Sequence, residues 1–354
     1  MRVVQLIDSL DGGGAERMAV NLANTLATEI DFSGLVTTRK EGNLKEALSS
    51  SVFYEFLEKK RSFDLKAVFK FRNYLIKNNV EIIHAHSSSF FLAVLTKLIY
   101  PKIKLFWHDH NGNRVNAKNG NIVIKIMSLF FDGVFTVNEE LKNWALDNLF
   151  TKKVLFIPNF SIKNNNEIKV TFLKGEEDKR IVCLANLRKP KNHLFLLESF
   201  FESKIHELGW TLHLIGKDSN DSYSNDLKTF IKSEKLEDYI FLYGSCNDVS
   251  HILSQSSVGV LASTYEGFPV TLLEYGLSKL LVLSTNVGYC KNVIKNKETG
   301  YLFSPNKKNK LIQLFKGVTD NNVNEALAKD FNDFVENKYS AKKIVKKIMQ
   351  NYLR

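Results

Sequence analysis

The sequence predicts an α/β protein of two domains, each an open sheet of parallel strands with helices between them. Three observations carry this prediction. The chain of 354 residues has room for two domains of ordinary size. Short apolar runs alternate with segments of helical apolar spacing in both halves of the chain. A polar, aperiodic stretch after Pro158 separates the two halves.

Composition and charge limit the classes of partner. Hydrophobic residues make up 44% of the chain and charged residues 25%, which is the balance of a globular protein. The net charge of +11 indicates an anionic partner, namely nucleic acid, an anionic membrane face or a phosphorylated substrate. The sequence has no homeodomain, zinc-finger or RNP-like pattern, which argues against specific nucleic-acid binding.

Cysteine usage and the apolar runs predict a cytoplasmic protein. Cys183, Cys246 and Cys290 form no C-x-x-C pair, which fits a reducing compartment without disulfides or a zinc site. The chain opens on a strand-like run at residues 2–7, so no signal peptide is predicted. The longest apolar tracts are too short or too charged to span a bilayer. Peripheral contact with the inner face of the cytoplasmic membrane is the alternative.

The first domain is predicted to span residues 1–165. Its first strand ends at three glycines, Gly12 to Gly14, which precede Glu16 and a helical pattern. Glycines between a strand and a helix let the backbone approach a ligand closely, so Gly13 and Gly14 are candidate ligand contacts. A plain flexible turn is the alternative, because the pattern is neither G-x-G-x-x-G nor a P-loop.

Two strand ends of the first domain carry histidines. His84 and His86 lie in a strand-like run, where alternate residues point to the same face. His86 stands at the carboxyl end, where α/β folds bind ligands, so we expect His86 to be functional and His84 to be structural. The next strand ends at His108, Asp109 and His110. We interpret these as a polar rim that contacts a sugar, with metal ligands or a solvated loop as the alternatives.

A linker is predicted at residues 166–178, followed by a second domain at residues 179–330. The first strand of this domain leads to Asn186, Arg188 and Lys191. Cations at the end of a strand could neutralise a diphosphate leaving group, and ordinary solvent-facing charge is the alternative.

The loop and helix around Glu266 organise the second domain. The apolar run at residues 258–262 predicts a buried strand, and Pro269 is expected as the first residue of the following helix. Glu274 then falls about five residues into that helix. The N–H groups after Gly267 form a phosphate site at the helix start. Two carboxylates that flank a phosphate site suit a nucleotide-sugar, which carries hydroxyls at both ends.

The spacing from Glu266 to Glu274 resembles the E-x7-E signature of the retaining, GT-B-type glycosyltransferases of family 4, the glycosyl transferases group 1. The glycine loop at Gly13 and the H-x-H strand tip at His86 are similar to passages of the same family. The resemblance implies the GT-B fold, with two Rossmann-like domains that face each other across a cleft. It also implies that the C-terminal helix, residues 331–354, crosses back to the first domain. An interfacial membrane helix is the other interpretation of the paired lysines in this segment.

The resemblance implies a role for each matching residue. Glu274 would bind the nucleotide ribose, Glu266 the donor-sugar hydroxyls and Lys191 the diphosphate. Asn186 occupies the place of the family's diphosphate-binding Arg, and Arg188 lies two residues later. The predicted donor contacts are Glu274, Arg188, Asn186, Gly216, Gly267, Phe268, Pro269, Val270, Gly13 and Gly14. The predicted catalytic residues are Glu266, Lys191 and His86, and the predicted acceptor contacts are His108, Asp109, His110 and Glu16.

We therefore predict a retaining, metal-independent glycosyltransferase of the hexosyl- or N-acetylhexosaminyl-transferring kind. It would move a sugar from a UDP- or GDP-linked donor to a glycan or polyprenyl-linked acceptor in bacterial surface polysaccharide synthesis. No cofactor, metal or nucleic acid is expected. The alternatives are a nucleotide-sugar epimerase of the same fold, and a non-catalytic scaffold that binds nucleotide-sugars or the membrane.

Overall fold

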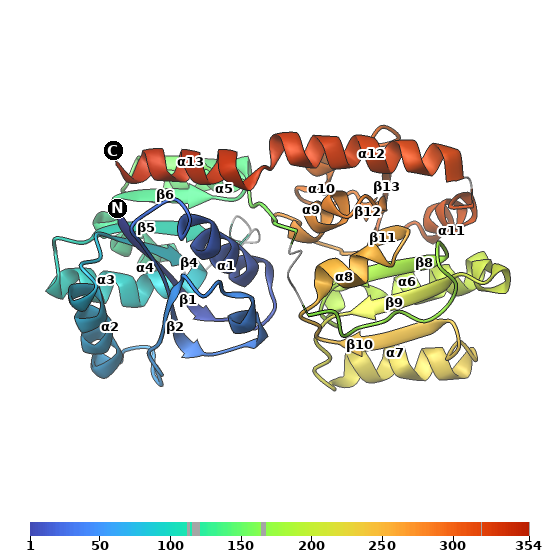
Figure 1. The fold of residues 1–354 in the computed structure, drawn as a ribbon, viewed down its shortest axis with the longest axis horizontal. Helices are drawn as coiled ribbons and strands as arrows, with labels where there is room; N and C mark the ends of the chain where they lie inside the picture. Colours follow the sequence, from blue (N-terminus) through green and yellow to red (C-terminus); the bar gives the residue numbers. More distant parts are fainter. Residues whose placement is uncertain (112–113, 115–120, 164–167, 320, 354) are drawn as a thin grey trace. The chain divides into compact units, whose positions relative to one another are not determined.

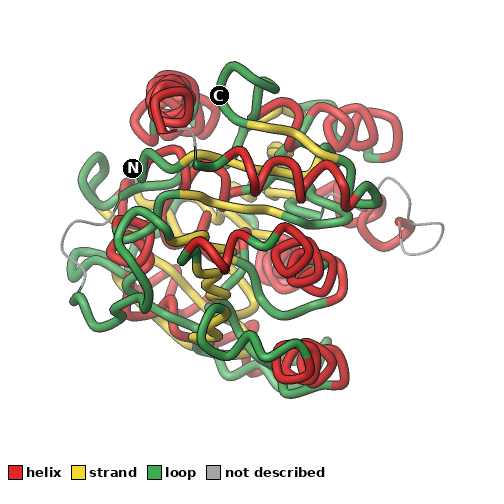
Figure 2. The backbone as a smooth tube through the Cα atoms, turned by 90° about the vertical axis from the view of Figure 1, so that its right-hand side faces the viewer, coloured by secondary structure: helices red, strands yellow, loops and turns green. Residues whose placement is uncertain are grey.

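A computed structural model describes residues 1–111, 114, 121–163, 168–319 and 321–353 (Figure 1). The chain divides into two units, Met1–Phe160 together with Ala341–Arg354, and Ser161–Ser340. Each unit holds one parallel sheet with helices along the chain between its strands (Figure 2). The predicted α/β class with two Rossmann-like domains is therefore confirmed.

The first unit is built on a seven-stranded sheet in the order β3-β2-β1-β4-β5-β6-β7, with every strand pair parallel. The strand order reverses between β1 and β4, and open α/β sheets bind ligands at such a switch point. The strands are β1 (Arg2–Ser9), β2 (Phe32–Lys40), β3 (Phe53–Phe56), β4 (Ile82–His86), β5 (Lys104–Asp109), β6 (Gly133–Thr136) and β7 (Val154–Phe156). The helices are α1 (Gly14–Leu26), α2 (Leu65–Lys77), α3 (Phe90–Ile99), α4 (Asn121–Met127), α5 (Glu139–Asn148) and α13 (Ala341–Tyr352).

The second unit is built on a six-stranded parallel sheet in the order β10-β9-β8-β11-β12-β13, which reverses between β8 and β11. The strands are β8 (Arg180–Leu184), β9 (Thr211–Ile215), β10 (Ile240–Gly244), β11 (Val258–Leu261), β12 (Leu281–Thr285) and β13 (Tyr301–Phe303). The helices are α6 (His193–Ser203), α7 (Ser222–Ser233), α8 (Val249–Ser254), α9 (Val270–Leu277), α10 (Cys290–Val293), α11 (Lys308–Gly317) and α12 (Asn321–Lys338).

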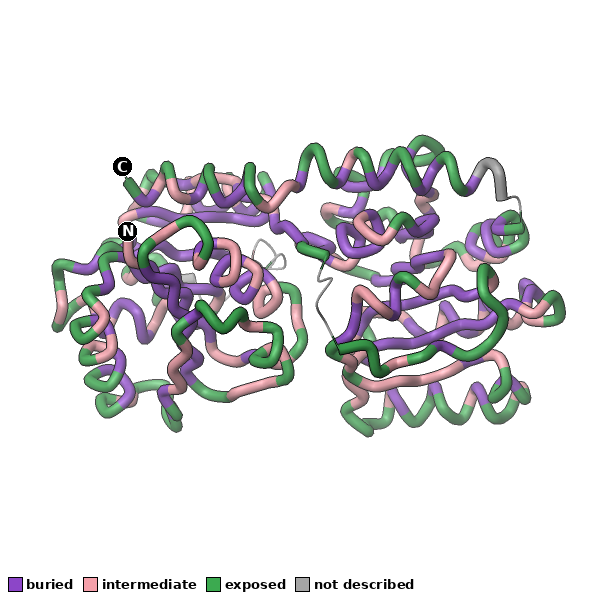
Figure 3. The backbone as a smooth tube through the Cα atoms, viewed as in Figure 1, coloured by how far each residue is buried: buried purple, intermediate pink, exposed green. Residues whose placement is uncertain are grey.

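Each sheet lies in an apolar core formed by its strands and by one face of each amphipathic helix (Figure 3). The apolar run predicted as a buried strand is β11, whose four residues are all buried. Side-chain caps fix several helix starts. Asp64 accepts from the Ala67 N–H at α2, and Asn138 accepts from the Leu141 N–H at α5, which satisfies amides that the helix itself leaves unpaired.

The structure divides the linker region differently from the prediction. The second unit begins at Ser161, and residues 170–173 of the predicted linker are bonded to it. The Asp248 carboxylate accepts from the backbone N–H groups of Val170 and Thr171, and the Gln255 side chain accepts from the Leu173 N–H. These side chains hold an extended segment on the second unit because they satisfy amides that have no strand partner.

The predicted C-terminal helix of residues 331–354 is two helices. α12 belongs to the second unit, where the Asn332 side chain donates to the Gly276 carbonyl of α9 at 2.9 Å. A Cβ at Gly276 would lie 2.6 Å from Val335, so the glycine permits this close approach. Only α13 belongs to the first unit, where the Tyr352 ring is buried and Lys347 donates to the Phe156 carbonyl.

The apolar face of α13 is buried in the first unit, through Ile344, Val345, Ile348 and Tyr352. This face is therefore not available to a membrane, which removes the basis for interpreting the segment as an interfacial helix. Among the residues that the structure describes, none of the helices combines the length and the apolar character needed to cross a membrane.

Tyr275 of α9 connects the two central strands of the second unit. β8 and β11 pair only at Ile181–Val258 and Val182–Gly259. Beyond these pairs the buried Tyr275 hydroxyl accepts from the Leu184 N–H at 2.8 Å and lies 3.2 Å from the Val260 carbonyl oxygen, to which it donates. The hydroxyl thus replaces the ladder bonds that these strands no longer make to each other.

Tyr275→Phe is expected to lower the free energy of unfolding by about 1–3 kcal/mol, because it leaves the Leu184 N–H buried without an acceptor. Urea unfolding followed by circular dichroism measures this loss. Tyr339→Phe is the matched control, since Tyr339 is also buried but, among the described residues, its hydroxyl makes no hydrogen bond to the backbone of a strand. Equal losses in the two variants would contradict the bridging role.

Candidate functional site

Lys191 and Glu266 meet at the carboxyl edge of the second sheet. Lys191 ends a short 3-10 helix, η5 (Lys189–Lys191), after β8, and Glu266 lies in the loop after β11. The Lys191 Nζ lies 2.6 Å from Glu266 Oε1, and the Ser263 hydroxyl donates to the same oxygen at 2.6 Å. The Lys191 side chain is 31% exposed and the Glu266 side chain 11% exposed. Both predicted catalytic residues of this unit therefore lie in one partly open ion pair.

Backbone contacts hold the Glu266 loop in place. The Thr264 N–H donates to the Pro190 carbonyl at 2.8 Å, which ties this loop to the loop that carries Lys191. Gly288 lies against the loop with φ +48°, and a Cβ there would stand 1.7 Å from the Glu266 carbonyl oxygen. Only glycine fits this position, because the backbone conformation and the available space both exclude a side chain.

The start of α9 offers fewer amides than the sequence predicted. The helix begins at Val270, and Pro269 is its N-cap instead of its first helical residue. The Val270 N–H already donates to the Phe268 carbonyl at 3.1 Å, and proline has no N–H. Of the four residues in the predicted phosphate contact, 267–270, Pro269 thus has no amide and the Val270 amide is bonded within the loop in this conformation.

Three further predicted donor contacts, Gly267, Phe268 and Glu274, lie in the Glu266 loop and in α9. Phe268 is buried and stacks on the Tyr289 ring with 5.2 Å between centroids, so it anchors the loop. Gly267 precedes it in the same loop. Glu274 is the fifth residue of α9 and is buried.

The predicted cation position at Asn186 has a structural contact. The Asn186 side-chain oxygen accepts from the Lys217 N–H at 2.8 Å, which joins the loops after β8 and β9. Gly216 lies between them with φ +157°, where a Cβ would stand 2.2 Å from the Ala185 carbonyl oxygen. Arg188 is exposed at the start of η5. The structure thus brings Lys191 to Glu266 but does not bring Arg188 into that ion pair.

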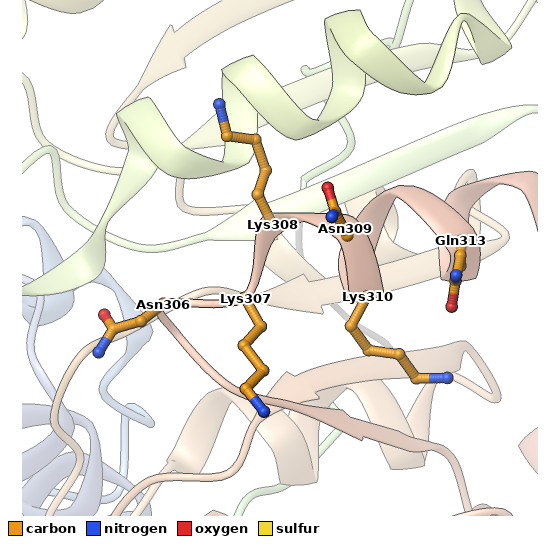
Figure 4. A pocket seen from close by; sticks show the side chains of 6 residues that line it. All are labelled: Asn306, Lys307, Lys308, Asn309, Lys310 and Gln313. Atoms are coloured by element: carbon orange, nitrogen blue, oxygen red, sulfur yellow. The ribbon is translucent and has the colours of Figure 1, made fainter.

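A separate basic hollow of about 470 Å³ lies at the start of α11 (Figure 4). It is lined by Asn306, Lys307, Lys308, Asn309, Lys310 and Gln313. Lys308 turns toward α6 and pairs with Glu198 and Glu202 at 2.9 and 2.8 Å. None of the predicted site residues lines this hollow, and part of its charge is already neutralised.

In the first unit, four histidines and Gln5 form a hydrogen-bonded cluster. His86 Nδ1 lies 3.0 Å from His110 Nε2, and His86 Nε2 lies 2.9 Å from the Gln5 side-chain oxygen. His84 Nε2 lies 3.1 Å from His108 Nδ1, and its Nδ1 faces the Tyr352 hydroxyl.

Burial sets the charge state of these histidines. Removal from water lowers the pKa of His84, His86 and His108 well below the usual range, and lowers the pKa of His110 to about 3. All four rings are therefore neutral near pH 7. A neutral ring offers one N–H donor and one acceptor, so the cluster binds through hydrogen bonds and not through positive charge.

The histidine cluster contains His108 and His110, for which metal ligation is an alternative interpretation of the sequence. Ring nitrogens of His84, His86 and His108 lie within 4.8 Å of one another. However, the His84 and His86 rings stack with 4° between their planes, so their in-plane lone pairs run parallel and do not converge on one ion. Both nitrogens of each of these two rings also face a hydrogen-bond partner. The geometry favours a hydrogen-bonded chain of rings over a tetrahedral metal site.

Asp109 is a buried residue and not part of an open rim. Its carboxylate forms a fork with Arg114, in which Nη2 and Oδ1 are 3.1 Å apart. Arg114 in turn lies over the Trp107 and Trp144 rings, 5.3 and 5.6 Å from their centroids. Burial raises the pKa of the Asp109 carboxyl, and the guanidinium offsets part of that effect. Direct contact of Asp109 with an acceptor would require this pair to open.

The glycine loop leads into α1 as predicted. Gly13 is the N-cap with extended backbone, and the Glu16 carboxylate folds back over it, 2.3 Å from where a Cβ would stand. Gly14 is the first helical residue. Asp8, at the end of β1, accepts from the Ser88 hydroxyl beyond β4. Six residues that contact the predicted site residues were not predicted from the sequence, namely Gln5, Asp8, Arg114, Ser263, Gly288 and Tyr352. Of these, only Asp8 carries a signal in the sequence, as an acidic residue at a strand end.

Lowering the pH from 7.5 to 5.5 is expected to destabilise the protein. The unfolded chain restores each histidine pKa to about 6.5, so below that pH the unfolded state binds protons that the folded state rejects. Each buried histidine then removes up to about 1.4 kcal/mol of stability per pH unit. Urea unfolding at a series of pH values measures the slope. His110→Gln should reduce it by about one proton, and an unchanged slope would show that this ring titrates normally.

Comparison with known proteins agrees with these two units. The family model described as Glycosyl transferases group 1 matches residues 164–350, and the model described as Glycosyltransferase Family 4 matches residues 12–160. The capsular polysaccharide biosynthesis glycosyltransferase CapH of Staphylococcus aureus is 25% identical, over 81% of this chain and 82% of its own.

A second relative is the UDP-Gal:alpha-D-GlcNAc-diphosphoundecaprenol alpha-1,3-galactosyltransferase of Escherichia coli. It is 24% identical over 99% of this chain and 95% of its own. The crystal structure of Anabaena HepE in complex with UDP and glucose superposes with a TM-score of 0.82 at 14% identity, and the alignment covers 99% of each chain. The chain therefore belongs to the glycosyl transferases group 1 family and is a glycosyltransferase with the GT-B fold.

Proposed function

We propose that this enzyme is a retaining, metal-independent glycosyltransferase that uses a nucleoside diphosphate sugar. The acceptor is a glycan or a lipid-linked glycan of bacterial surface polysaccharide synthesis. The observation that carries the proposal is the partly open Lys191–Glu266 ion pair, which lies at the carboxyl edge of the second sheet where the strand order reverses. Glu266 of this pair precedes Glu274 by eight residues.

The ion pair supports a division of roles at the donor. The Lys191 ammonium is the more exposed partner, so it can turn to a diphosphate while Glu266 becomes free to accept from donor-sugar hydroxyls. Glu274, on α9, binds the ribose, as the family resemblance implies. The positive charge that balances the departing diphosphate then comes from Lys191 and the start of α9, which is why no metal is invoked.

The state of the histidines supports the retaining course. A general base works best with a pKa near the operating pH, whereas burial depresses the pKa of His86 well below its usual range. In the retaining course proposed here, the departing phosphate itself accepts the proton of the acceptor. His86 would act at the reacting face as a neutral hydrogen-bonding group, which requires one of its two bonds, to His110 or to Gln5, to open.

The names of the relatives support the choice of substrates. The E. coli relative is named for a UDP-galactose donor and a diphosphoundecaprenol-linked acceptor, and the S. aureus relative for capsular polysaccharide. We therefore propose a UDP-linked hexose or N-acetylhexosamine as donor and a polyprenyl-linked glycan as acceptor.

Glu266→Gln and Lys191→Ala are each expected to reduce turnover by about 10²–10³, the typical loss when one preorganised charge-stabilising group is removed from an active site. The measurement is sugar transfer from the UDP-sugar onto a polyprenyl-diphosphate glycan. Lys189→Ala is the matched control, because Lys189 is an exposed lysine of the same η5 turn. Near-normal transfer by either site variant would overturn the assignment. Conversion of the donor sugar without acceptor would instead identify an epimerase.

Nucleotide-sugars are expected to raise the melting temperature, because a ligand that binds only the folded state stabilises it by about 2.7 kcal/mol at 100 times its Kd. A panel of UDP-, GDP-, ADP- and CMP-sugars should give a shift with the UDP compounds. Glu274→Gln should lose that shift while keeping its own melting temperature. A chain that responds to none of the panel would favour the non-catalytic scaffold.

A further inference from the structure

Residues 59–104 form a long basic segment in the first unit. This segment carries ten Lys and Arg residues against two acidic residues, Asp64 and Glu81, and two of the ten, Lys70 and Lys97, pair with Glu55 and Asp132 from outside it. This segment contains α2, β4 and α3. Charge concentrated in this way creates a local potential that attracts an anionic partner.

α2 has two apolar faces, of which only one faces the core. Ala67, Val68, Phe71 and Leu75 are buried against the sheet. Leu65, Phe69 and Ile76 are exposed by 55%, 52% and 41%. At about 100° per residue these three side chains fall within about 40° of one another, so they form a single outward stripe. An exposed apolar stripe of this kind marks an interaction surface.

Basic residues flank this stripe. Lys66 and Lys77 are exposed and lie on one side of it by helical spacing, while Arg72 lies on the other side. The Arg72 Nε donates to the Ile99 carbonyl at 3.4 Å, which brings the end of α3 next to α2. Leu98 and Ile99, at that end of α3, are also exposed. We call Leu65, Lys66, Phe69, Ile76, Lys77, Leu98 and Ile99 the α2–α3 surface.

We propose that the α2–α3 surface docks this enzyme on an anionic lipid bilayer. An apolar stripe rimmed by Lys and Arg, with no acidic residue within α2, is the pattern that seats a helix at the boundary between head groups and acyl chains. The lysines are attracted to anionic head groups, and the stripe enters the layer below them. The proposal concerns a surface outside the donor site and does not depend on which sugar is transferred.

The alternative anionic partner is nucleic acid, and the apolar stripe argues against it. Binding to nucleic-acid phosphates is stabilised by basic residues but not by exposed Leu and Ile side chains. Binding to an anionic bilayer is stabilised by both. α13 is not an equivalent surface, because its lysines project from a helix whose apolar residues are buried.

The test is co-sedimentation of the purified full chain with vesicles, without donor or acceptor. Vesicles of phosphatidylcholine mixed with the anionic lipid phosphatidylglycerol are expected to bind the protein. Pure phosphatidylcholine should bind it at least about tenfold more weakly, because the lysines then find no counter-charge. The triple variant Leu65→Ser, Phe69→Ser, Ile76→Ser should weaken binding to the anionic vesicles by more than about tenfold.

Two controls separate this surface from general effects. Leu208→Ser removes an exposed leucine of the second unit and should leave vesicle binding unchanged. Lys342→Glu with Lys346→Glu removes as much charge from the exposed side of α13 and should weaken binding by less than Lys66→Glu with Lys77→Glu. An unchanged melting temperature confirms that each variant is folded.

Equal binding by the triple variant and the parent chain would overturn the proposal, as would equal binding to neutral and anionic vesicles. Tight binding to single- or double-stranded nucleic acid, abolished by Lys66→Glu with Lys77→Glu but unaffected by the triple variant, would also overturn it in favour of that partner. Since the assay contains no sugar nucleotide, its failure leaves the proposed transfer reaction standing, and a failed transfer assay leaves the membrane result standing.

Discussion

The second unit depends on one hydroxyl group that takes the place of a strand pairing. β8 and β11 pair over only two residues each and then diverge toward their carboxyl ends. Diverging central strands would leave backbone groups buried without partners, which costs about 1–3 kcal/mol for each group. The Tyr275 hydroxyl, projecting from α9, bonds to both strands in the gap. Gly259 makes room for the ring, since a Cβ there would lie 2.5 Å from it.

This arrangement determines where the functional groups stand. Because α9 is fixed in the fork between the two strands, the loop that precedes it and the loop that follows β8 must share one edge of the sheet. The bond from the Thr264 N–H to the Pro190 carbonyl joins them, and the Lys191–Glu266 ion pair forms at the junction. Asn186 stands where the family has an Arg, and it has a structural role here, because its side-chain oxygen accepts from the Lys217 N–H in the next loop along the same edge.

The sequence predicted the fold well because its signals are local. Buried parallel strands appear as short apolar runs, and glycine loops or polar residues mark where they end, so both sheets could be predicted, as could the positions of Lys191, Glu266 and His86 at or after strand ends. The contacts that support these residues are not local. Gln5 lies 81 positions from His86, and Tyr352 lies 268 positions from His84, so no spacing pattern joins them. The sequence also could not show that the Val270 N–H is bonded to the Phe268 carbonyl, because that bond depends on the conformation of the loop before α9.

The net charge of +11 does not show where on the chain an anionic partner would bind, but the positions of the charged residues do. At the donor edge the positive charge of Lys191 is already matched by Glu266, so a diphosphate entering there exchanges one partner for another and accounts for little of the net +11. Part of the excess lies in residues 59–104, where ten basic residues stand against two acidic ones, and part in residues 338–354, where six basic residues stand against none. Self-repulsion makes such clustering unfavourable for folding. Ion pairs of Lys70 with Glu55 and of Lys97 with Asp132 offset part of the repulsion, whereas Lys66 and Lys77 have no acidic neighbour within α2. The exposed Leu65, Phe69 and Ile76 side chains lie beside Lys66 and Lys77, and this combination is why we propose a lipid surface, and not a polyphosphate chain, as a second anionic partner.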